Sequence, residues 1–237
     1  YPTYVLVHGA WSDESAWGFV RNELAIHANV VVVNLPAHGA DDTNGSGIGL
    51  ADYVNTVTKA INLQKGKVIL VGHSMAGEII SQVAENIPQK IEKLVYVAAY
   101  LPKNGESVID LSKKDVTSKI GPALQFSKDF SLATIQKDVV HDHICADCSD
   151  AMKDILLKYH RAEPVKALND KVTLGAKFAA VPKYYIATTK DEVIPFDLQQ
   201  QMVKANGTVK KVYELPTSHL PFVVMPDKFV QILNSIR

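Results

Sequence analysis

The chain has 237 residues, of which 47% are hydrophobic and 21% are charged, a composition that excludes an intrinsically disordered protein. Its 25 basic and 25 acidic residues balance to a formal net charge of zero, so no electrostatic feature predicts binding to a nucleic acid or a membrane surface. No apolar run approaches the ~20 residues that a membrane-spanning helix needs.

Short apolar runs rich in β-branched residues alternate with longer amphipathic segments along the chain. The predicted strands are Thr3–Val7, Val30–Asn34, Val68–Val71, Leu94–Ala98, Tyr184–Ala187 and Lys211–Leu215. The predicted helices are Ser15–His27, Leu50–Leu63, Met75–Asn86, Pro195–Ala205 and Pro226–Ile236. Most of the strands are apolar throughout, which is typical of parallel strands covered on both faces. We therefore predict an α/β fold with a mostly parallel six-stranded sheet and helices on both faces.

Residues 101–180 interrupt this alternation, because they contain polar amphipathic segments and no clear strand. The stretch is too long for a plain connection. We predict a mostly helical insertion between the fourth and fifth strands, placed above a core of residues 1–100 and 181–237. We expect this insertion to set substrate choice rather than chemistry. An extra helical layer without a functional role is the alternative.

The most informative motif is Gly72-His73-Ser74-Met75-Ala76-Gly77, which joins a predicted strand to a predicted helix. A serine at such a tight turn needs small neighbours two residues away, and Gly72 and Ala76 are small. Its hydroxyl then lies at the carboxyl edge of the sheet, where ligands bind in open α/β folds. We predict that Ser74 is a catalytic nucleophile.

A serine nucleophile needs an imidazole base and a carboxylate that orients the base. His219 follows the last predicted strand and therefore reaches the same edge of the sheet. Among the other histidines, we expect His73 to pack into the sheet and His38 to be solvated in a turn. The chain order Ser, Asp, His indicates Asp191, at the end of the fifth strand, as the carboxylate. Its neighbour Glu192 is the competitor, and we expect that side chain to be solvated.

Two backbone N–H groups are candidates for an oxyanion hole. The N–H of Met75 lies at the start of a predicted helix, and the N–H of Ala10 follows the first strand in His8-Gly9-Ala10-Trp11. Gly9 allows a tight turn there. Trp11 is expected on the wall of the substrate pocket, although packing against the insertion explains it equally well.

Four motifs together resemble the α/β-hydrolase superfamily: His8–Trp11, Gly72–Gly77, Asp191–Pro195 and Ser218–Phe222. More narrowly, they resemble the branch of small esterases that includes plant methyl esterases, hydroxynitrile lyases and bacterial pyrethroid-type hydrolases. The likeness covers nearly the whole chain outside the insertion. It implies an α/β-hydrolase fold, a helical cap over the active site and ester hydrolysis without a cofactor. One departure is Ala76, where plant members usually have Gly.

The lyases of this branch differ from the chain at two positions. They carry Thr where Gly9 stands and Lys where Leu220 follows the histidine. That lysine stabilises the departing cyanide, which Leu220 cannot do. The resemblance therefore favours an esterase over a lyase.

The insertion also contains both cysteines, in His141-Asp142-His143-Ile144-Cys145-Ala146-Asp147-Cys148. Zinc is one interpretation, because imidazole and thiolate are zinc ligands, but the two histidines are only two residues apart and no second cluster exists. An exchangeable disulfide between Cys145 and Cys148 is another. We favour two unpaired cysteines and expect no metal.

The sequence therefore predicts serine-dependent hydrolysis of a hydrophobic carboxylic ester through an acyl-enzyme, without a cofactor. A lactone hydrolase on the same residues and a receptor-like protein with little turnover are the alternatives. The expected apolar pocket wall includes Trp11, Phe222 and Phe126. We expect a monomer or homodimer in the cytoplasm whose only partner is the small-molecule substrate. The first residue is Tyr1, so we expect a trimmed or processed N-terminus.

Overall fold

Six parallel strands form the central sheet of the computed structural model, which describes all residues from Tyr1 to Arg237. The strand order is β2-β1-β3-β4-β8-β9. The strands are β1 (Thr3–Val7), β2 (Asn29–Val33), β3 (Val68–His73), β4 (Ile91–Val97), β8 (Lys183–Thr188) and β9 (Val209–Leu215). All six predicted strands are confirmed, with ends that differ by a few residues. The central strands are apolar on both faces because helices cover both faces of the sheet.

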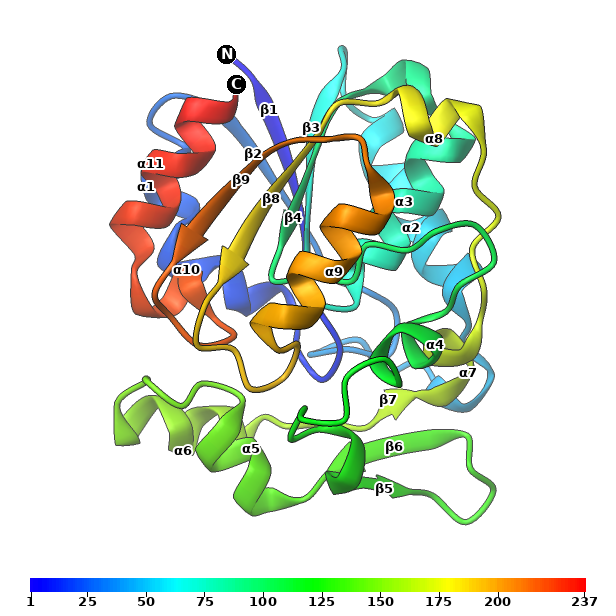
Figure 1. The fold of residues 1–237 in the computed structure, drawn as a ribbon, viewed down its shortest axis with the longest axis vertical. Coiled ribbons are helices and arrows are strands. Elements are labelled where there is room, and N and C mark those ends of the chain that lie inside the picture. The colour runs from blue at the N-terminus through cyan, green and yellow to red at the C-terminus, as the bar shows by residue number, and fades with distance from the viewer.

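Two helical layers enclose the sheet (Figure 1). One contains α1 (Arg21–Leu24), α10 (Pro221–Val224) and α11 (Pro226–Ile236), and the other contains α2 (Leu50–Asn62), α3 (Ala76–Asn86), α8 (Ala176–Ala180) and α9 (Phe196–Asn206). Alternate residues of β3 point into opposite layers: Val68 and Leu70 pack in the core beneath α2 and α3, whereas Ile69 and Val71 pack beneath α11. The predicted helix Ser15–His27 is instead a 3-10 helix, Glu14–Phe19, followed by the short α1.

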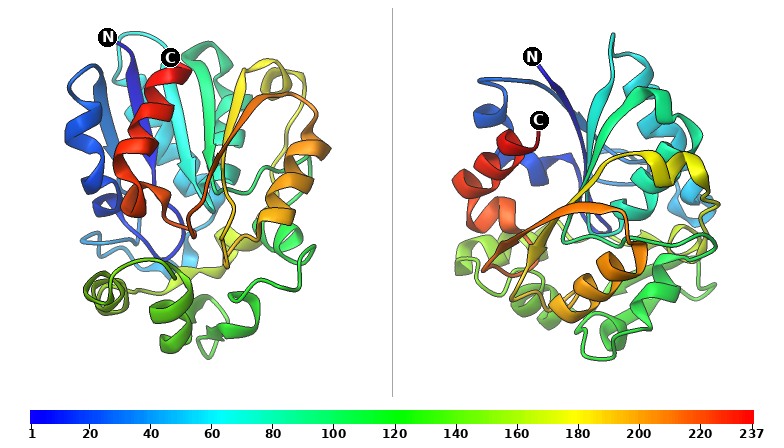
Figure 2. Two further views of the ribbon diagram at one scale, coloured as in Figure 1. Left: turned by 60° about the vertical axis from the view of Figure 1, so that its left-hand side comes forward. Right: turned by 45° about the horizontal axis from the view of Figure 1, so that its top comes forward.

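Most of residues 101–180, called the cap below, lies against the carboxyl ends of the strands, while both chain termini lie at the opposite end of the molecule (Figures 1 and 2). The last helix of this segment, α8, instead lies beside α3, toward the end that holds the termini. The other helices of the cap are α4 (Val108–Ser112), α5 (Lys137–His143), α6 (Asp150–Lys158) and α7 (Val165–Asn169). Three short strands, β5 (Leu124–Phe126), β6 (Leu132–Ile135) and β7 (Glu163–Pro164), also form an antiparallel sheet. The expectation that this segment lacks strands is therefore wrong, although helices dominate it.

The two cysteines of the cap form a disulfide between Cys145 and Cys148, so the prediction of unpaired cysteines is wrong. The turn after α5 brings their Cα atoms to 5.3 Å, within the range that a disulfide spans. Both sulfurs are therefore bonded to one another rather than free for zinc. Separately, none of the helices combines the length and the apolar character needed to span a membrane.

Candidate active site

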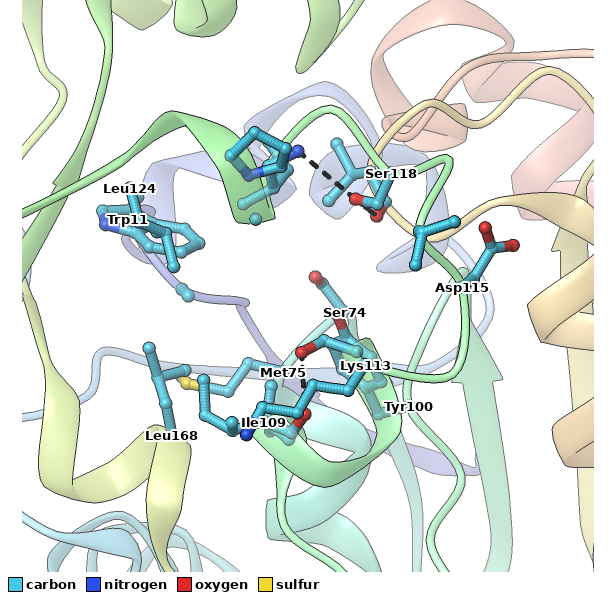
Figure 3. A pocket seen from close by; sticks show the side chains of 18 residues that line it. Trp11, Ser74, Met75, Tyr100, Ile109, Lys113, Asp115, Ser118, Leu124 and Leu168 are labelled. Carbon is cyan, nitrogen blue, oxygen red and sulfur yellow. Dashed lines mark hydrogen bonds between the residues drawn. The ribbon is translucent and has the colours of Figure 1, made fainter.

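Ser74 occupies a tight turn between β3 and α3, with a φ angle of 56°. A non-glycine residue with positive φ persists only where its surroundings hold it. Here the Ser74 N–H donates to Val97 C=O (3.2 Å), and the Tyr100 N–H donates to Ser74 C=O (3.1 Å). A Cβ on Gly77 would lie 1.7 Å from the backbone oxygen of Tyr100, so the turn packs directly on the chain after β4. The serine side chain points into a cavity (Figure 3).

Asp191 and His219 form a buried hydrogen-bonded pair at the ends of β8 and β9. His219 Nδ1 lies 2.7 Å from Asp191 Oδ2. The other carboxylate oxygen accepts the backbone N–H groups of Val193 and Ile194, both at 2.8 Å. The Thr188 hydroxyl donates to Oδ2 (2.8 Å). These donors fix the orientation of the carboxylate, and the carboxylate in turn orients the imidazole.

Glu192 points away from this pair, and its side chain, 35% exposed, lies 3.1 Å from His143 Nδ1. Asp191, by contrast, has a fully buried carboxylate. The backbone turn thus directs the two adjacent acidic residues to different surroundings, and only Asp191 reaches His219.

Ser74 and His219 line the same cavity, although no hydrogen bond joins their side chains in this structure. His73 supports the histidine from behind: its Nε2 lies 2.8 Å from the His219 carbonyl oxygen and the two rings are 4.5 Å apart. Because a carbonyl can only accept, Nε2 of His73 carries the proton. Burial lowers the pKa of His73 well below its usual range, with His219 adding to the effect, so this ring stays neutral. His73 is buried as expected, but no local pattern indicates its contact with His219.

The loop after β1, residues 8–11, is called the oxyanion loop below. A Cβ on Gly9 would lie 2.9 Å from Ser74 Cβ, so this loop packs against the serine turn. The N–H groups of Ala10 and Met75 donate no hydrogen bond within the protein. Two such free donors beside a nucleophile can stabilise a developing oxyanion.

His8 fixes the peptide that carries the Ala10 N–H. Its Nε2 accepts the N–H of Leu35 (3.1 Å), so its proton is on Nδ1, which donates to the carbonyl of Gly9 (2.8 Å). In a trans peptide the N–H points opposite to the carbonyl. The hydrogen bond from His8 to the Gly9 carbonyl therefore keeps the Ala10 N–H pointing away from His8. Burial, aided by the neighbouring His38, lowers the pKa of His8 to about 4, so His8 is neutral at pH 7.

The cap contacts the oxyanion loop through a buried carboxylate, Glu163. Glu163 is fully buried and accepts the Trp11 N–H (2.9 Å), His38 Nε2 (2.6 Å) and the Tyr53 hydroxyl (2.5 Å). The expectation that His38 is solvated is therefore wrong: it is buried because a cap residue 125 positions away pairs with it. A second cap contact involves the loop that carries His219, where the Ser218 N–H donates to the Asp147 carboxylate of the cap (2.9 Å).

Two cavities meet at Ser74, and they share Ala10, Trp11, Ser74 and Val193. The α4 cavity, about 320 Å³, lies between α4, α7 and the start of β5 (Figure 3). The α6 cavity, about 310 Å³, lies between α5, α6 and the loop that carries His219. Both are mainly apolar. Each is large enough for a drug-sized fragment.

The structure places Trp11 on the wall of both cavities and Phe222 on the wall of the α6 cavity. The prediction that Phe126 lines the pocket is wrong. Phe126 ends β5, is 48% exposed and packs at a tilt against Phe130 (5.8 Å between ring centroids) outside both cavities. Leu124, two residues earlier in β5, lines the α4 cavity instead.

Comparison with known proteins shows the family of this chain. The family model described as "Alpha/beta hydrolase family" matches residues 4–232. The chain belongs to the alpha/beta hydrolase family. This alpha/beta hydrolase is 27% identical to Methylesterase 7 of Arabidopsis thaliana over 250 residues, which cover 98% of this chain and 95% of the relative. It is 24% identical to Pyrethroid hydrolase of Sphingobium wenxiniae over 246 residues, covering 97% and 85%.

The fold of this alpha/beta hydrolase also matches solved structures. A methylesterase from Arabidopsis superposes with a TM-score of 0.87 at 20% identity, covering 100% of this chain and 98% of the other. Other relatives, whose names describe chloroplastic proteins, are 26–30% identical, and the chain spans 55–63% of their length.

Proposed function

We propose that this alpha/beta hydrolase is a serine esterase in which Ser74 attacks the carbonyl carbon of a hydrophobic carboxylic ester. The observation that carries the proposal is the meeting of three features at one point. A strained serine turn, a histidine oriented by the buried Asp191 and two free backbone N–H groups all lie on the walls of two apolar cavities that meet at Ser74. The names of the relatives, methylesterase and pyrethroid hydrolase, support the same reaction class.

In the proposed mechanism, His219 Nε2 takes the hydroxyl proton of Ser74 as Oγ bonds to the carbonyl carbon. The negative charge that develops on the carbonyl oxygen is stabilised by the N–H groups of Ala10 and Met75. The imidazolium of His219, stabilised by Asp191, then gives its proton to the departing alcohol, leaving an acyl group on Ser74. Water, deprotonated by the same imidazole, cleaves the acyl-enzyme and releases the carboxylic acid.

The apolar walls favour a hydrophobic substrate. The only arginines are Arg21, Arg161 and Arg237, and none of them lines either cavity. The one cationic side chain on these walls, apart from histidines, is Lys113 at the α4 cavity. A strongly anionic ester therefore finds no bidentate partner at this site.

The test is hydrolysis of a hydrophobic 4-nitrophenyl ester by the wild type and by Ser74→Ala. We expect turnover in the wild type and a loss of several orders of magnitude in the variant, because the residual activity of a triad enzyme without its nucleophile is only ~10³–10⁴ over water. Circular dichroism controls for folding. Matched open-chain esters and lactones in the same assay separate the two hydrolase alternatives. If the wild type bound such ligands but did not turn them over, the receptor-like alternative would replace this proposal.

A further inference from the structure

We infer that the substrate is an ester with a bulky apolar group on each side, whose acyl part occupies the α4 cavity and whose alcohol part occupies the α6 cavity. The inference rests on the proposed function. It selects esters of large alcohols over methyl esters, and it assigns a direction to the bound substrate.

The direction follows from which catalytic groups border each cavity. Ser74 and Ala10 border both cavities, whereas His219 borders only the α6 cavity and Met75 borders only the α4 cavity. The leaving oxygen must face His219, because this imidazole delivers its proton. The alcohol carbon bonded to that oxygen therefore extends into the α6 cavity. The acyl chain leaves the carbonyl carbon in another direction and extends past Met75 into the α4 cavity.

The size of the alcohol follows from the volume of the α6 cavity. Its walls are apolar side chains of α5, α6 and the His219 loop, including Val140, Met152, Leu156 and Phe222. A water occupies about 30 Å³ in the liquid, so a methyl group would leave space for roughly ten waters in a cavity of about 310 Å³. An aromatic or branched alcohol would displace that water from apolar walls. Burying a phenyl-sized group favours such an ester by about 10- to 100-fold in kcat/KM.

One variant in each cavity tests the direction. Met152→Phe narrows the α6 cavity and Ile109→Phe narrows the α4 cavity, and neither residue belongs to the proposed catalytic groups. Acylation and deacylation rates are measured separately by rapid mixing, with benzyl and methyl esters of one acid and with 4-nitrophenyl esters of short and long acids. Esters of one acid form the same acyl-enzyme, so the deacylation rate does not depend on which alcohol has left.

We expect the benzyl ester to exceed the methyl ester by at least 10-fold in kcat/KM. Met152→Phe should reduce that ratio at least 5-fold and leave deacylation unchanged, whereas Ile109→Phe should slow deacylation of the long acyl group. Equal rates for methyl and benzyl esters would overturn the substrate class. A change of deacylation in Met152→Phe without any effect of alcohol size would reverse the direction. Both results require turnover at Ser74, so they are distinct from a failure of the proposed function.

A separate observation concerns the buried carboxylate of the cap. We propose that Glu163 is a positioning residue that holds the oxyanion loop in its active conformation. Trp11, next to the proposed donor Ala10, has a φ angle of 57°, a conformation that needs external support. The cap supplies that support twice: Glu163 accepts the Trp11 backbone N–H, and the carbonyl of Ala133 accepts its indole N–H at 2.8 Å.

The core holds Glu163 in turn. Both ring nitrogens of His38 face acceptors, the Pro36 carbonyl (2.8 Å) and Glu163 (2.6 Å), so both must carry protons and the ring is an imidazolium. Burial opposes that charge, but Glu163 outweighs it and raises the pKa of His38. The carboxylate is therefore locked by an ion pair and by the Tyr53 hydroxyl. This arrangement differs from the expectation that the cap affects substrate choice alone.

The test compares Glu163→Gln with Tyr96→Phe, which removes a different buried hydrogen bond, to Ser81 Oγ (2.6 Å), away from the oxyanion loop. A trifluoromethyl ketone reports on the oxyanion hole, because its hemiketal oxygen takes the position of the oxyanion. We expect Glu163→Gln to lower kcat and the affinity for the ketone by the same factor, about 10- to 100-fold, with KM changed less than about 3-fold. Tyr96→Phe should lower only the melting temperature.

Loss of stability in Glu163→Gln with unchanged kcat and ketone affinity would overturn the proposal. If that variant does not fold, Tyr53→Phe keeps the Trp11 contact and removes one donor to Glu163. A parallel loss of a few-fold in kcat and ketone affinity is then expected. Wild-type values of both quantities in Tyr53→Phe would also contradict the proposed role.

Discussion

Replacing Asp191 by Asn tests the orientation of His219 with an almost isosteric change. One carboxylate oxygen of Asp191 accepts two backbone N–H groups at 2.8 Å, from Val193 and Ile194, and the other accepts His219, the Thr188 hydroxyl and, at a longer 3.3 Å, the Gln199 amide. An asparagine has one oxygen and one NH₂ group. If the NH₂ faced the backbone, two N–H donors would meet a donor, so the oxygen must remain there and the NH₂ must face His219.

The consequence is a change of tautomer. With an NH₂ donor against Nδ1, the neutral imidazole of His219 accepts at Nδ1 and carries its proton on Nε2. It can then no longer take the proton of Ser74. In the best-characterised Ser-His-Asp triad the same substitution costs ~10⁴ in kcat, or about 5.5 kcal/mol of activation free energy. We expect a loss of this size with KM changed only slightly.

The assay is the steady-state hydrolysis of a 4-nitrophenyl ester. Glu192→Gln is the matched control, because Glu192 is adjacent but contacts only the partly exposed His143. We expect that control to retain activity within about 2-fold. If Glu192→Gln were the damaging change and Asp191→Asn the mild one, the carboxylate would be misassigned. If neither mattered, His219 would not be the base.

Three further predictions concern the protein around the site. Gly77→Ala should destabilise the fold by at least about 3 kcal/mol in urea unfolding, because its Cβ would meet a backbone oxygen at 1.7 Å. Gly18→Ala is the control and should be nearly neutral, because there is open space around Gly18. Equal stability of the two variants would contradict the packing of the serine turn. Neither carboxyl oxygen of Glu78 has a partner, and burial, aided by Glu106 and Asp110, raises its pKa well above 4.5. Glu78→Leu should therefore raise the free energy of unfolding at pH 7 by about 1–3 kcal/mol. The gain should be smaller at pH 4, where the carboxyl is largely protonated in the folded and the unfolded protein. A gain that did not shrink on acidification would refute this prediction. The pKa of His8 falls from 6.5 to about 4 on folding. The free energy of unfolding should therefore be at its full value above pH 6.5 and fall by about 3 kcal/mol as the pH drops to 4. His8→Gln should remove this loss of stability, as measured by urea unfolding at several pH values.

The central sheet was predictable because its signal is local. Each strand is a short apolar run, and the tight turn at Ser74 requires small residues that can be read directly from Gly72 and Ala76. Chain order then limits the histidine and the carboxylate to the ends of later strands, where His219 and Asp191 form their pair.

The unpredicted features depend on contacts between distant residues. Nothing near His38 indicates burial, because its partner Glu163 lies 125 residues away. The strand that carries Glu163 has only two residues, too few for any periodic pattern. Phe126 ends a hairpin strand of only three residues, too short for a pattern that would show which of its side chains are exposed. For Cys145 and Cys148, the spacing permits a disulfide, a metal site or free thiols, and only the fold of the turn after α5 decides in favour of the disulfide.

The proposal that Ser74 is the nucleophile is tested most directly by trapping the acyl-enzyme. The protein is mixed with excess 4-nitrophenyl ester, quenched in acid within milliseconds and digested, and the peptides are sequenced by mass spectrometry. We expect the mass of one acyl group, carried by the peptide that contains Ser74 and localised to that residue. Rapid ester turnover with the acyl group on another residue, or with no acyl group on the protein at all, would contradict it.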